Sequence, residues 1–420
     1  MATAPAPALA HTPPAGAAPR WLHNPVLVLL LAVGAVVAGS AAFLSVAPNR
    51  LLSGQGLRLA QLQLGSTAGW AGWANLWPLT TVLLPTALLA LAALLPQRRR
   101  HDALAALAAA TLLAGLLALA GAQARQLAGG QGALTRVSLG AGFWCLATLA
   151  GLAASNALQR LRLGPVAHLL AQAALWLPVL LLRSGALDAL SLLQEFSNKQ
   201  EVFGAACLRH GQIVLAALGP ALLLGAPLGL AAARRPALAR PVLALLGAVQ
   251  TVPSIALFGL LIAPLAWAGS RWPGWGLQGI GLLPAAMALA LYALLPIVHG
   301  VLAGLQQVPA AVLDAATGLG LSPRQRFYQV QLPLALPVWL SALRVTLVQT
   351  VGLAVVAALI GAGGLGALVF QGLASSALDL VLLGVLPVVA LALALDNCLR
   401  ALTRVASLAV RPDTQPAATP

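Results

Sequence analysis

The chain has 420 residues, of which 60% are hydrophobic and only 7% are charged. A soluble domain carries about 25% charged residues, so this composition excludes an ordinary soluble protein and indicates an integral membrane protein. The net charge of +15 would suggest nucleic acid as a partner in a soluble chain, but here the Arg residues lie in short clusters between apolar segments. That pattern indicates orientation in a membrane, so membrane lipids are expected as partners and nucleic acid is not.

The N-terminal part of the chain predicts a loose tail followed by a first group of membrane spans. Residues 1–20 are rich in Ala and Pro without a helical period, which is typical of disorder. Residues 21–210 then hold five apolar segments and no recognisable functional motif, so this region is expected to be accessory.

Membrane-spanning helices need about 18 or more apolar residues, and ten segments of the chain approach or exceed that length. They are Pro25–Val46, Trp77–Leu95, Ala103–Gln123, Leu139–Leu158, Val166–Leu182, Gln212–Ala233, Val242–Leu265, Leu282–Leu302, Leu334–Ile360 and Leu380–Leu399. Their Leu, Ala and Val runs are continuous rather than alternating, which argues against a barrel. The expected fold class is an all-α integral membrane protein with about ten transmembrane helices.

The Lys and Arg residues predict the orientation. With the N-terminus inside, 14 of the 23 face the cytoplasm, eight face out and Arg344 lies within a span, which follows the positive-inside rule. Both termini of this multi-pass inner-membrane protein are then expected in the cytoplasm. The tail of residues 406–420 is expected to be disordered.

The region 211–405 differs from the first half because polar residues interrupt its spans. Gln250 and Thr251 lie near the middle of the seventh span, and Gln349 and Thr350 near the middle of the ninth. Pro253, followed by Ser254, can open the seventh helix and free backbone carbonyls. These six residues are candidates for a translocation pathway. Hydrogen bonding between helices is the alternative.

A polar loop at residues 309–333 predicts a helix, a turn and a second helix on the cytoplasmic side. Pro309 suits the first turn of a helix that runs through Asp314 to Leu319, and Gly320 suits its stop. Ser322 then suits an N-cap, with proline at the following first helical position.

The same loop has features of a docking surface. Ala315 and Ala316 form a small face that allows close approach of a partner, and Leu332 and Pro333 return the chain to the membrane. The alternative is that Asp314 forms an internal ion pair with one of the two Arg residues that follow Pro323.

The residues from Asp314 to Pro333 match the spacing E-A-A-x3-G-x9-I-x-L-P of ABC importer permeases, with Asp for Glu and Val330 for Ile. In that family this loop docks into a separate ATPase subunit. The segments 250–257, 292–298 and 357–366 resemble permeases of glycine betaine, choline and related osmoprotectant importers. The extra N-terminal spans resemble the longer, YehY-like subclass. The resemblance implies a type I importer permease core over residues 211–405.

The resemblance also gives a role to the glycine-rich segment that follows the ninth span. It implies that Gly361, Gly363, Gly364 and Gly366 begin an external gate, which meets a solute-binding protein. A simple flexible turn is the competing interpretation.

Catalysis and nucleotide binding within this chain are not expected. A P-loop needs a lysine after its glycine-rich turn, and the chain's only lysine, Lys199, follows Asn198. The six His residues are scattered, and no catalytic or metal-binding set is visible. The chain is therefore expected to be a non-enzymatic subunit without a cofactor of its own.

The sequence thus predicts a permease subunit of an ATP-driven importer, for glycine betaine or a related quaternary-ammonium osmoprotectant. Expected partners are ABC ATPase subunits that bind the ATP, a periplasmic or surface solute-binding protein, and a second permease copy or a paralogous permease. Two alternatives remain among transporters: an ion-coupled secondary transporter, or an ABC permease for another small polar solute such as an amino acid. A membrane protein without a transport function is a third.

Overall fold

The computed structural model describes residues 23–49, 54–62, 77–96, 98–130, 135–161, 163–174, 180, 182 and 184–410. The predicted tail at residues 1–20 lies outside these residues. The chain divides into two compact units. The first comprises residues 1–44, 56–123 and 139–162, and the second comprises residues 45–55, 124–138 and 163–420.

The first unit is a group of helices: α1 (Pro25–Ser40), α2 (Trp77–Leu94), α3 (Arg99–Gly130), which extends beyond the unit, and α4 (Ala141–Arg160). Asn24 begins α1, and its side-chain oxygen accepts hydrogen bonds from the backbone N–H of Leu27 and from Arg160, both at 3.2 Å. The Asn24 amide also donates to Asn156 at 3.2 Å. These bonds join the start of α1 to the end of α4.

Three short strands, which were not predicted from the sequence, form one sheet in the order β2-β1-β3. They are β1 (Ala42–Ala47), β2 (Gln55–Arg58) and β3 (Arg136–Leu139), and a short 3-10 turn over Leu59–Gln61 follows β2. The predicted first span, Pro25–Val46, was therefore too long, because α1 ends at Ser40 and the chain continues as a strand. Gly39 and Ser40 are weak helix formers, while Phe43 and Val46 suit extended backbone.

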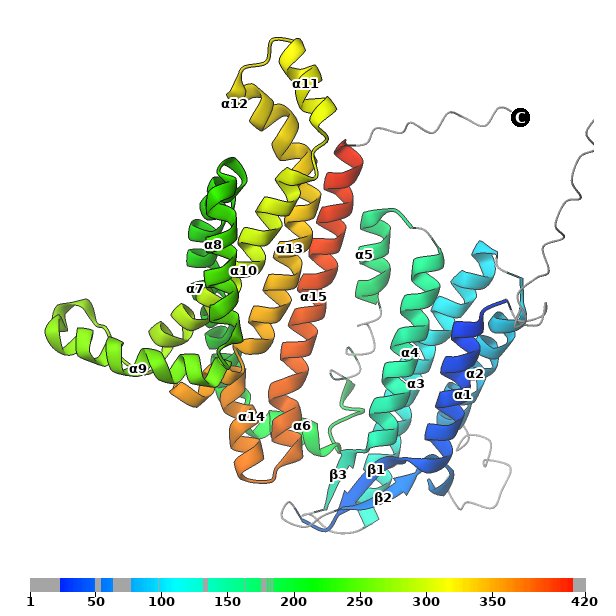
Figure 1. Cartoon of the computed structure of the whole chain (residues 1–420). Coiled ribbons are helices and arrows are strands. Elements are labelled where there is room, and N and C mark those ends of the chain that lie inside the picture. Colours follow the sequence, from blue (N-terminus) through cyan, green and yellow to red (C-terminus); the bar gives the residue numbers. More distant parts are fainter. Residues whose placement is uncertain are drawn as a thin grey trace, which may run out of the picture. The chain divides into compact units, whose positions relative to one another are not determined.

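The second unit contains the remaining helices (Figure 1). They are α5 (Pro165–Ala174), α6 (Ser191–Asn198), α7 (Gln200–Arg234), α8 (Pro236–Thr251), α9 (Ser254–Arg271), α10 (Leu282–Gln306), α11 (Ala310–Gly318), α12 (Pro323–Arg326), α13 (Leu332–Leu353), α14 (Leu365–Ala374) and α15 (Leu378–Val410). Short 3-10 segments cover Pro273–Trp275 and Val356–Ile360, and a π-helical turn covers Phe327–Gln331. In Figure 1, α11 and α12 project from the end of this unit at which α15 finishes, and α14 lies at the opposite end.

Helix α10 lies between α7 and α13 and packs closely on both. On the α7 side the close approach depends on Gly225 and Gly229, four residues apart. A Cβ atom on Gly225 would lie 2.8 Å from a methyl carbon of Ile297, and one on Gly229 would lie 2.8 Å from Val301. Paired small residues at this spacing let helix backbones approach closely in membranes.

On the other side, α10 supplies the glycines itself. A Cβ atom on Gly300 would lie 2.2 Å from the Cβ atom of Ala342 on α13, and one on Gly304 would lie 2.9 Å from the Ala335 carbonyl oxygen. Two pairs of glycines four residues apart therefore fix three helices side by side.

Two predicted spans differ from the described helices. The predicted span Val242–Leu265 is broken into α8 and α9, because Pro253 lacks an N–H and Val252 before it takes an extended conformation. Of the predicted span Val166–Leu182, the structure describes a helix only as far as Ala174, and residues 175–179 lie outside the described part. At the C-terminal end, α15 continues to Val410, so residues 406–410 of the tail that was expected to be disordered are helical, and residues 411–420 lie outside the described part.

The expected fold class is confirmed. In the described part of the chain, seven helices are long and apolar enough to cross a membrane: α3, α4, α7, α9, α10, the continuous stretch from α12 through α13, and α15. Three shorter apolar helices join them, namely α1, most of α2, and α14. The seven long helices each fall within or overlap one of the predicted spans, as do α1 and α2, whereas α14 has 10 residues and lies outside every predicted span.

Candidate functional site

The loop predicted to dock a partner projects from the second unit as a helix, a tight turn and a second helix. Gly320 ends the first helix with a positive φ of 78°, and its N–H bonds to the Thr317 carbonyl oxygen at 2.9 Å. Ser322 and Gln325 then form a reciprocal capping box at the start of α12. Pro309 is the N-cap of α11 and lies one position before the first turn in which it was expected.

The outer surface of this loop combines one acidic side chain with small and apolar ones. Asp314 and Ala315 are exposed, Leu319 is 82% exposed, and Ala316 is buried beneath them. Arg326 donates to the Thr317 hydroxyl at 2.8 Å instead of pairing with Asp314. No ion pair of Asp314 is found within the described residues, so the structure gives no support to the internal pairing alternative.

The base of the loop is held against the membrane helices. The Arg234 guanidinium, at the end of α7, lies 5.4 Å from the ring centroid of Phe327, which is within cation–π range. Gln307 donates to the Leu334 carbonyl oxygen at 3.0 Å, which ties the end of α10 to the start of α13. Leu332 and Pro333 are the first two residues of α13, so the predicted return to the membrane occurs where it was expected.

Gln250, one of the candidate pathway residues, connects two helices. Its amide donates to the Tyr292 carbonyl oxygen at 2.9 Å. In a regular helix that carbonyl accepts from the residue four positions later, which here is Pro296 and has no N–H. The Tyr292 hydroxyl in turn donates to the Val252 carbonyl at the end of α8. Gln250 therefore makes the interhelical bond that was the alternative to a pathway role.

The other candidate pathway residues lie at the break between α8 and α9 and near the C-terminal end of α13. Thr251 is exposed and bonds to the Ala248 carbonyl oxygen at 2.7 Å, while Ser254 is the half-buried first residue of α9. Gln349 is exposed on α13. Thr350 is buried and bonds to the Thr346 carbonyl oxygen at 2.8 Å within the same helix.

The backbone of the glycine-rich turn after α13 takes conformations that glycine adopts readily and other residues do not. Gly361, Gly363 and Gly364 have φ values of 77°, 79° and 76°. A Cβ atom on Gly366 would lie 2.0 Å from the Val355 carbonyl oxygen.

The turn is also fastened to α7. Arg209 donates from Nε to the Ala362 carbonyl oxygen at 2.9 Å. A Cβ atom on Gly364 would lie 3.3 Å from the His210 Cα atom, so the turn rests directly on that helix. These contacts give the segment one defined position.

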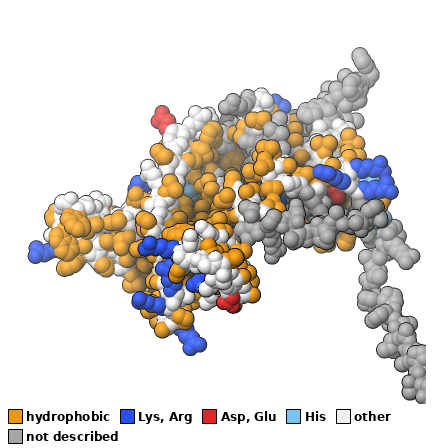
Figure 2. All heavy atoms as spheres, turned by 90° about the horizontal axis from the view of Figure 1, so that it is seen from above, with side chains coloured by type: hydrophobic (Ala, Val, Ile, Leu, Met, Phe, Trp, Pro, Cys, Tyr) orange, Lys and Arg blue, Asp and Glu red, His pale blue; other side chains and the backbone are white. Residues whose placement is uncertain are grey.

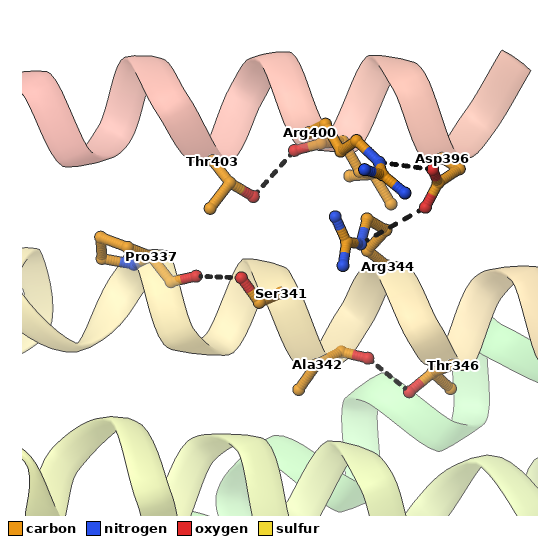
Figure 3. A network of polar contacts seen from close by, with 9 residues as sticks. Pro337, Ser341, Ala342, Arg344, Thr346, Asp396, Arg400 and Thr403 are labelled. Carbon is orange, nitrogen blue, oxygen red and sulfur yellow. Dashed lines mark hydrogen bonds and ion pairs between the residues drawn. The ribbon is translucent and has the colours of Figure 1, made fainter. Parts of the chain in front are cut away.

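An ion-pair network joins α13 and α15, as Figure 3 shows. Asp396 accepts from Arg400 at 2.6 Å and lies 3.4 Å from Nε of Arg344. Arg344 carries a charge that is costly to place at the centre of a membrane span. It lies in the middle of α13, where pairing with Asp396 offsets that cost.

A second polar network, which was not predicted from the sequence, lies at the start of α15. Asp379 accepts from the hydroxyl of Ser191 at 2.5 Å and from that of Ser138 at 3.0 Å. Nearby, Arg136 donates to the side chain of Gln194 at 2.5 Å. An acidic residue in the first turn of an apolar helix is the only sequence signal of this network, and it does not identify the partners.

Two family models match the chain, one on each side of its middle. Residues 23–193 match the N-terminal domain of the ABC transporter permease YehY. Residues 225–407 match the binding-protein-dependent transport system inner membrane component.

Several characterised proteins are similar to the C-terminal half. The osmoprotectant import permease OsmW of Salmonella typhimurium is 39% identical over 188 residues, which cover 45% of this chain and 84% of that protein. The glycine betaine/proline betaine permease ProW of Escherichia coli is 34% identical over 192 residues, covering 46% of this chain and 51% of ProW. Among solved structures, an inward-facing form of the MetNI methionine ABC transporter covers 49% of this chain and 97% of its own, with 23% identity and a TM-score of 0.44.

Proposed function

We propose that this chain, which belongs to the osmoprotectant branch of the ABC importer permeases, is the membrane-spanning subunit of an ATP-driven importer in the inner membrane. Its cargo is glycine betaine or a related quaternary-ammonium osmoprotectant. This substrate class is supported by the names of OsmW, ProW and the choline permease OpuBB of Bacillus subtilis. OpuBB is 32% identical to this chain. A separate ATPase subunit supplies the energy.

The exposed face of α11 is the observation that carries the docking role. Asp314, Ala315 and Leu319 present a carboxylate, a small contact point and an apolar side chain on a projecting loop. The shape of the loop depends on Ala316 and Gly320. The chain returns from the loop to the membrane at Leu332 and Pro333. Because the capping box and the Arg234–Phe327 contact stiffen it, movement of a bound ATPase is transmitted to α10 and α13.

The substrate path and gate form the rest of the proposal. We assign Thr251, Pro253, Ser254, Gln349 and Thr350 to the wall of the path, with Gln250 holding α8 against α10 beside it. The turn with Gly361, Gly363, Gly364 and Gly366 is the external gate, where a solute-binding protein delivers the cargo. A second permease copy, or a paralogue, completes the channel. Both termini lie in the cytoplasm with the docking loop.

Uptake into cells or vesicles tests the proposal. The chain is produced with an ATPase subunit and a solute-binding protein from its own source, and uptake of radiolabelled glycine betaine is measured with and without ATP. We expect uptake that depends on ATP and on all three proteins. Uptake that continues without the ATPase but collapses with the ion gradient contradicts the proposal and favours a secondary transporter.

The docking role has its own test, independent of the cargo. Ala315→Glu adds a bulky charge to the exposed face of α11, and Ala237→Glu adds the same charge to an exposed position at the start of α8. Ala315→Glu is expected to abolish co-purification of the ATPase, and the Ala237→Glu control is expected to keep it. If the ATPase co-purifies with the Ala315→Glu variant as well as it does with the Ala237→Glu variant, docking at α11 is excluded.

A further inference from the structure

An apolar groove runs between α7 and α13 and has α10 as its floor. Its volume is about 290 Å³, close to the lower size of small-molecule sites. The wall on α7 includes Pro227 and Leu230, and the wall on α13 includes Leu332 and Trp339. Phe327, from the segment that joins the docking loop to α13, also lines the groove. Every lining side chain is apolar except for the indole N–H of Trp339.

The groove also lies at the basic end of the second unit. Arg234 is exposed and follows Leu230 by one turn of α7, so both lie on the same helix face. Arg235, Arg240, Arg324 and Arg326 belong to the neighbouring helix ends. Asp314 is the only carboxylate between residues 202 and 378. Figure 2, seen from above, shows blue side chains gathered around the projecting loop.

We propose that this groove is a binding site for one anionic phospholipid. An acyl chain lies along the apolar walls, and the phosphate lies at Arg234. Arg234 also covers the ring of Phe327, so the lipid contacts the base of the docking loop.

The charges favour a lipid over a second copy of this chain as the occupant. A copy related by an axis along the membrane normal brings its own basic end to the same level, so Arg residues would face Arg residues. An anionic headgroup is instead attracted to this basic end, and its phosphate pairs with Arg234, which contacts the lining residue Phe327. The site depends on the cytoplasmic placement of this end, but not on the identity of the cargo.

Native mass spectrometry of the full-length protein in mild detergent tests the site. Dioleoylphosphatidylglycerol and dioleoylphosphatidylcholine are titrated in turn, since they share acyl chains and differ in headgroup charge. The wild type is expected to retain the phosphatidylglycerol more strongly. Arg234→Gln is expected to reduce that preference about fivefold, the factor that one basic contact gives. Trp339→Ala, which removes a large apolar side chain from the groove wall, is expected to weaken both lipids alike.

Arg240→Gln is the matched control, because Arg240 is exposed at the same end but does not flank the groove. Its lipid preference is expected to equal that of the wild type. Three outcomes overturn the proposal: equal binding of the two lipids by the wild type, an equal loss in the Arg240 and Arg234 variants, or cross-linking of two copies through Ala226→Cys and Leu336→Cys. The last outcome would make the groove a subunit interface.

Discussion

Gln250 illustrates how one side chain can compensate for a proline elsewhere. Pro296 leaves the Tyr292 carbonyl without its usual partner inside α10, and the Gln250 amide from α8 takes that place at 2.9 Å. The sequence places a polar residue near the middle of a span, but its role depends on the register between two helices. That register is a property of packing and cannot be read from spacing along one helix.

The relation between Gln250 and Pro296 is testable by a double-mutant cycle. Gln250→Leu is expected to lower the free energy of unfolding by about 1 kcal/mol, in the range of interhelical hydrogen bonds in membranes. In a Pro296→Ala background the same change is expected to cost less, because the introduced alanine supplies the missing N–H. The measurement is reversible unfolding in mixed micelles. An equal loss in both backgrounds would show that Gln250 does not satisfy that carbonyl.

Gly320 provides a second test at single-residue scale. Its φ of 78° is unfavourable for a residue with a Cβ atom, by about 1–2 kcal/mol. Gly320→Ala is therefore expected to distort the turn and to reduce ATPase binding several-fold in a pull-down. Gly318→Ala, in the last turn of α11 with open space around it, is the control and is expected to bind as the wild type does. If Gly318→Ala lost ATPase binding while Gly320→Ala kept it, the proposed role of the turn at Gly320 would be contradicted.

Among the elements, α10 has the most constrained environment because glycine pairs bring α7 and α13 against it. The local signals for caps and turns were sufficient to predict α11, Gly320 and the start of α12, since these depend on neighbours in sequence. The break at Pro253 was expected only as a local opening. The sheet was not predicted, because its strands are short and β1 pairs with β3, which lies about 90 positions later in the chain.

Compensating substitutions test the contact between α10 and α13. A Cβ atom on Gly300 would meet that of Ala342 at 2.2 Å, so Gly300→Ala is expected to destabilise the protein by about 1–3 kcal/mol. Combining it with Ala342→Gly is expected to recover most of the loss. Gly219→Ala in α7, where no atom lies within 4 Å, is the control for helix propensity. Thermal unfolding in detergent measures all three. Without recovery in the double variant, residues 300 and 342 do not meet at the helix interface.

At the scale of the whole molecule, the structural units do not follow the boundary between the two matched families. The match to the YehY N-terminal domain ends at residue 193, yet residues 124–138 and 163–193 belong to the same compact unit as the core. Asp379 is one reason, because Ser138 and Ser191 both bond to it at the start of α15. Contacts between residues 241 and 188 positions apart leave no pattern in a single sequence.

The bonds to Asp379 allow a more specific test of the prediction that the first spans are accessory to transport. A chain that begins at Leu163 keeps α5, α6 and the bond from Ser191 to Asp379. A chain that begins at Ser197, with a leading span added to restore orientation, loses both Ser partners of Asp379. We expect the longer version to retain ATP-dependent uptake near the full-length level and the shorter version to show less, because the start of α15 beside α14 is no longer held.

Both truncated chains are produced with the ATPase and the solute-binding protein, and assembly is measured by co-purification before uptake is compared. Asp379→Ala in the full-length chain separates the bond from the deletion, and it is expected to lower uptake about as much as beginning at Ser197. If the chain from Leu163 assembles with the ATPase but transports nothing, residues before 163 take part in the transport cycle and are not accessory. If the Ser197 version equals the Leu163 version, the Asp379 network has no role in positioning α15.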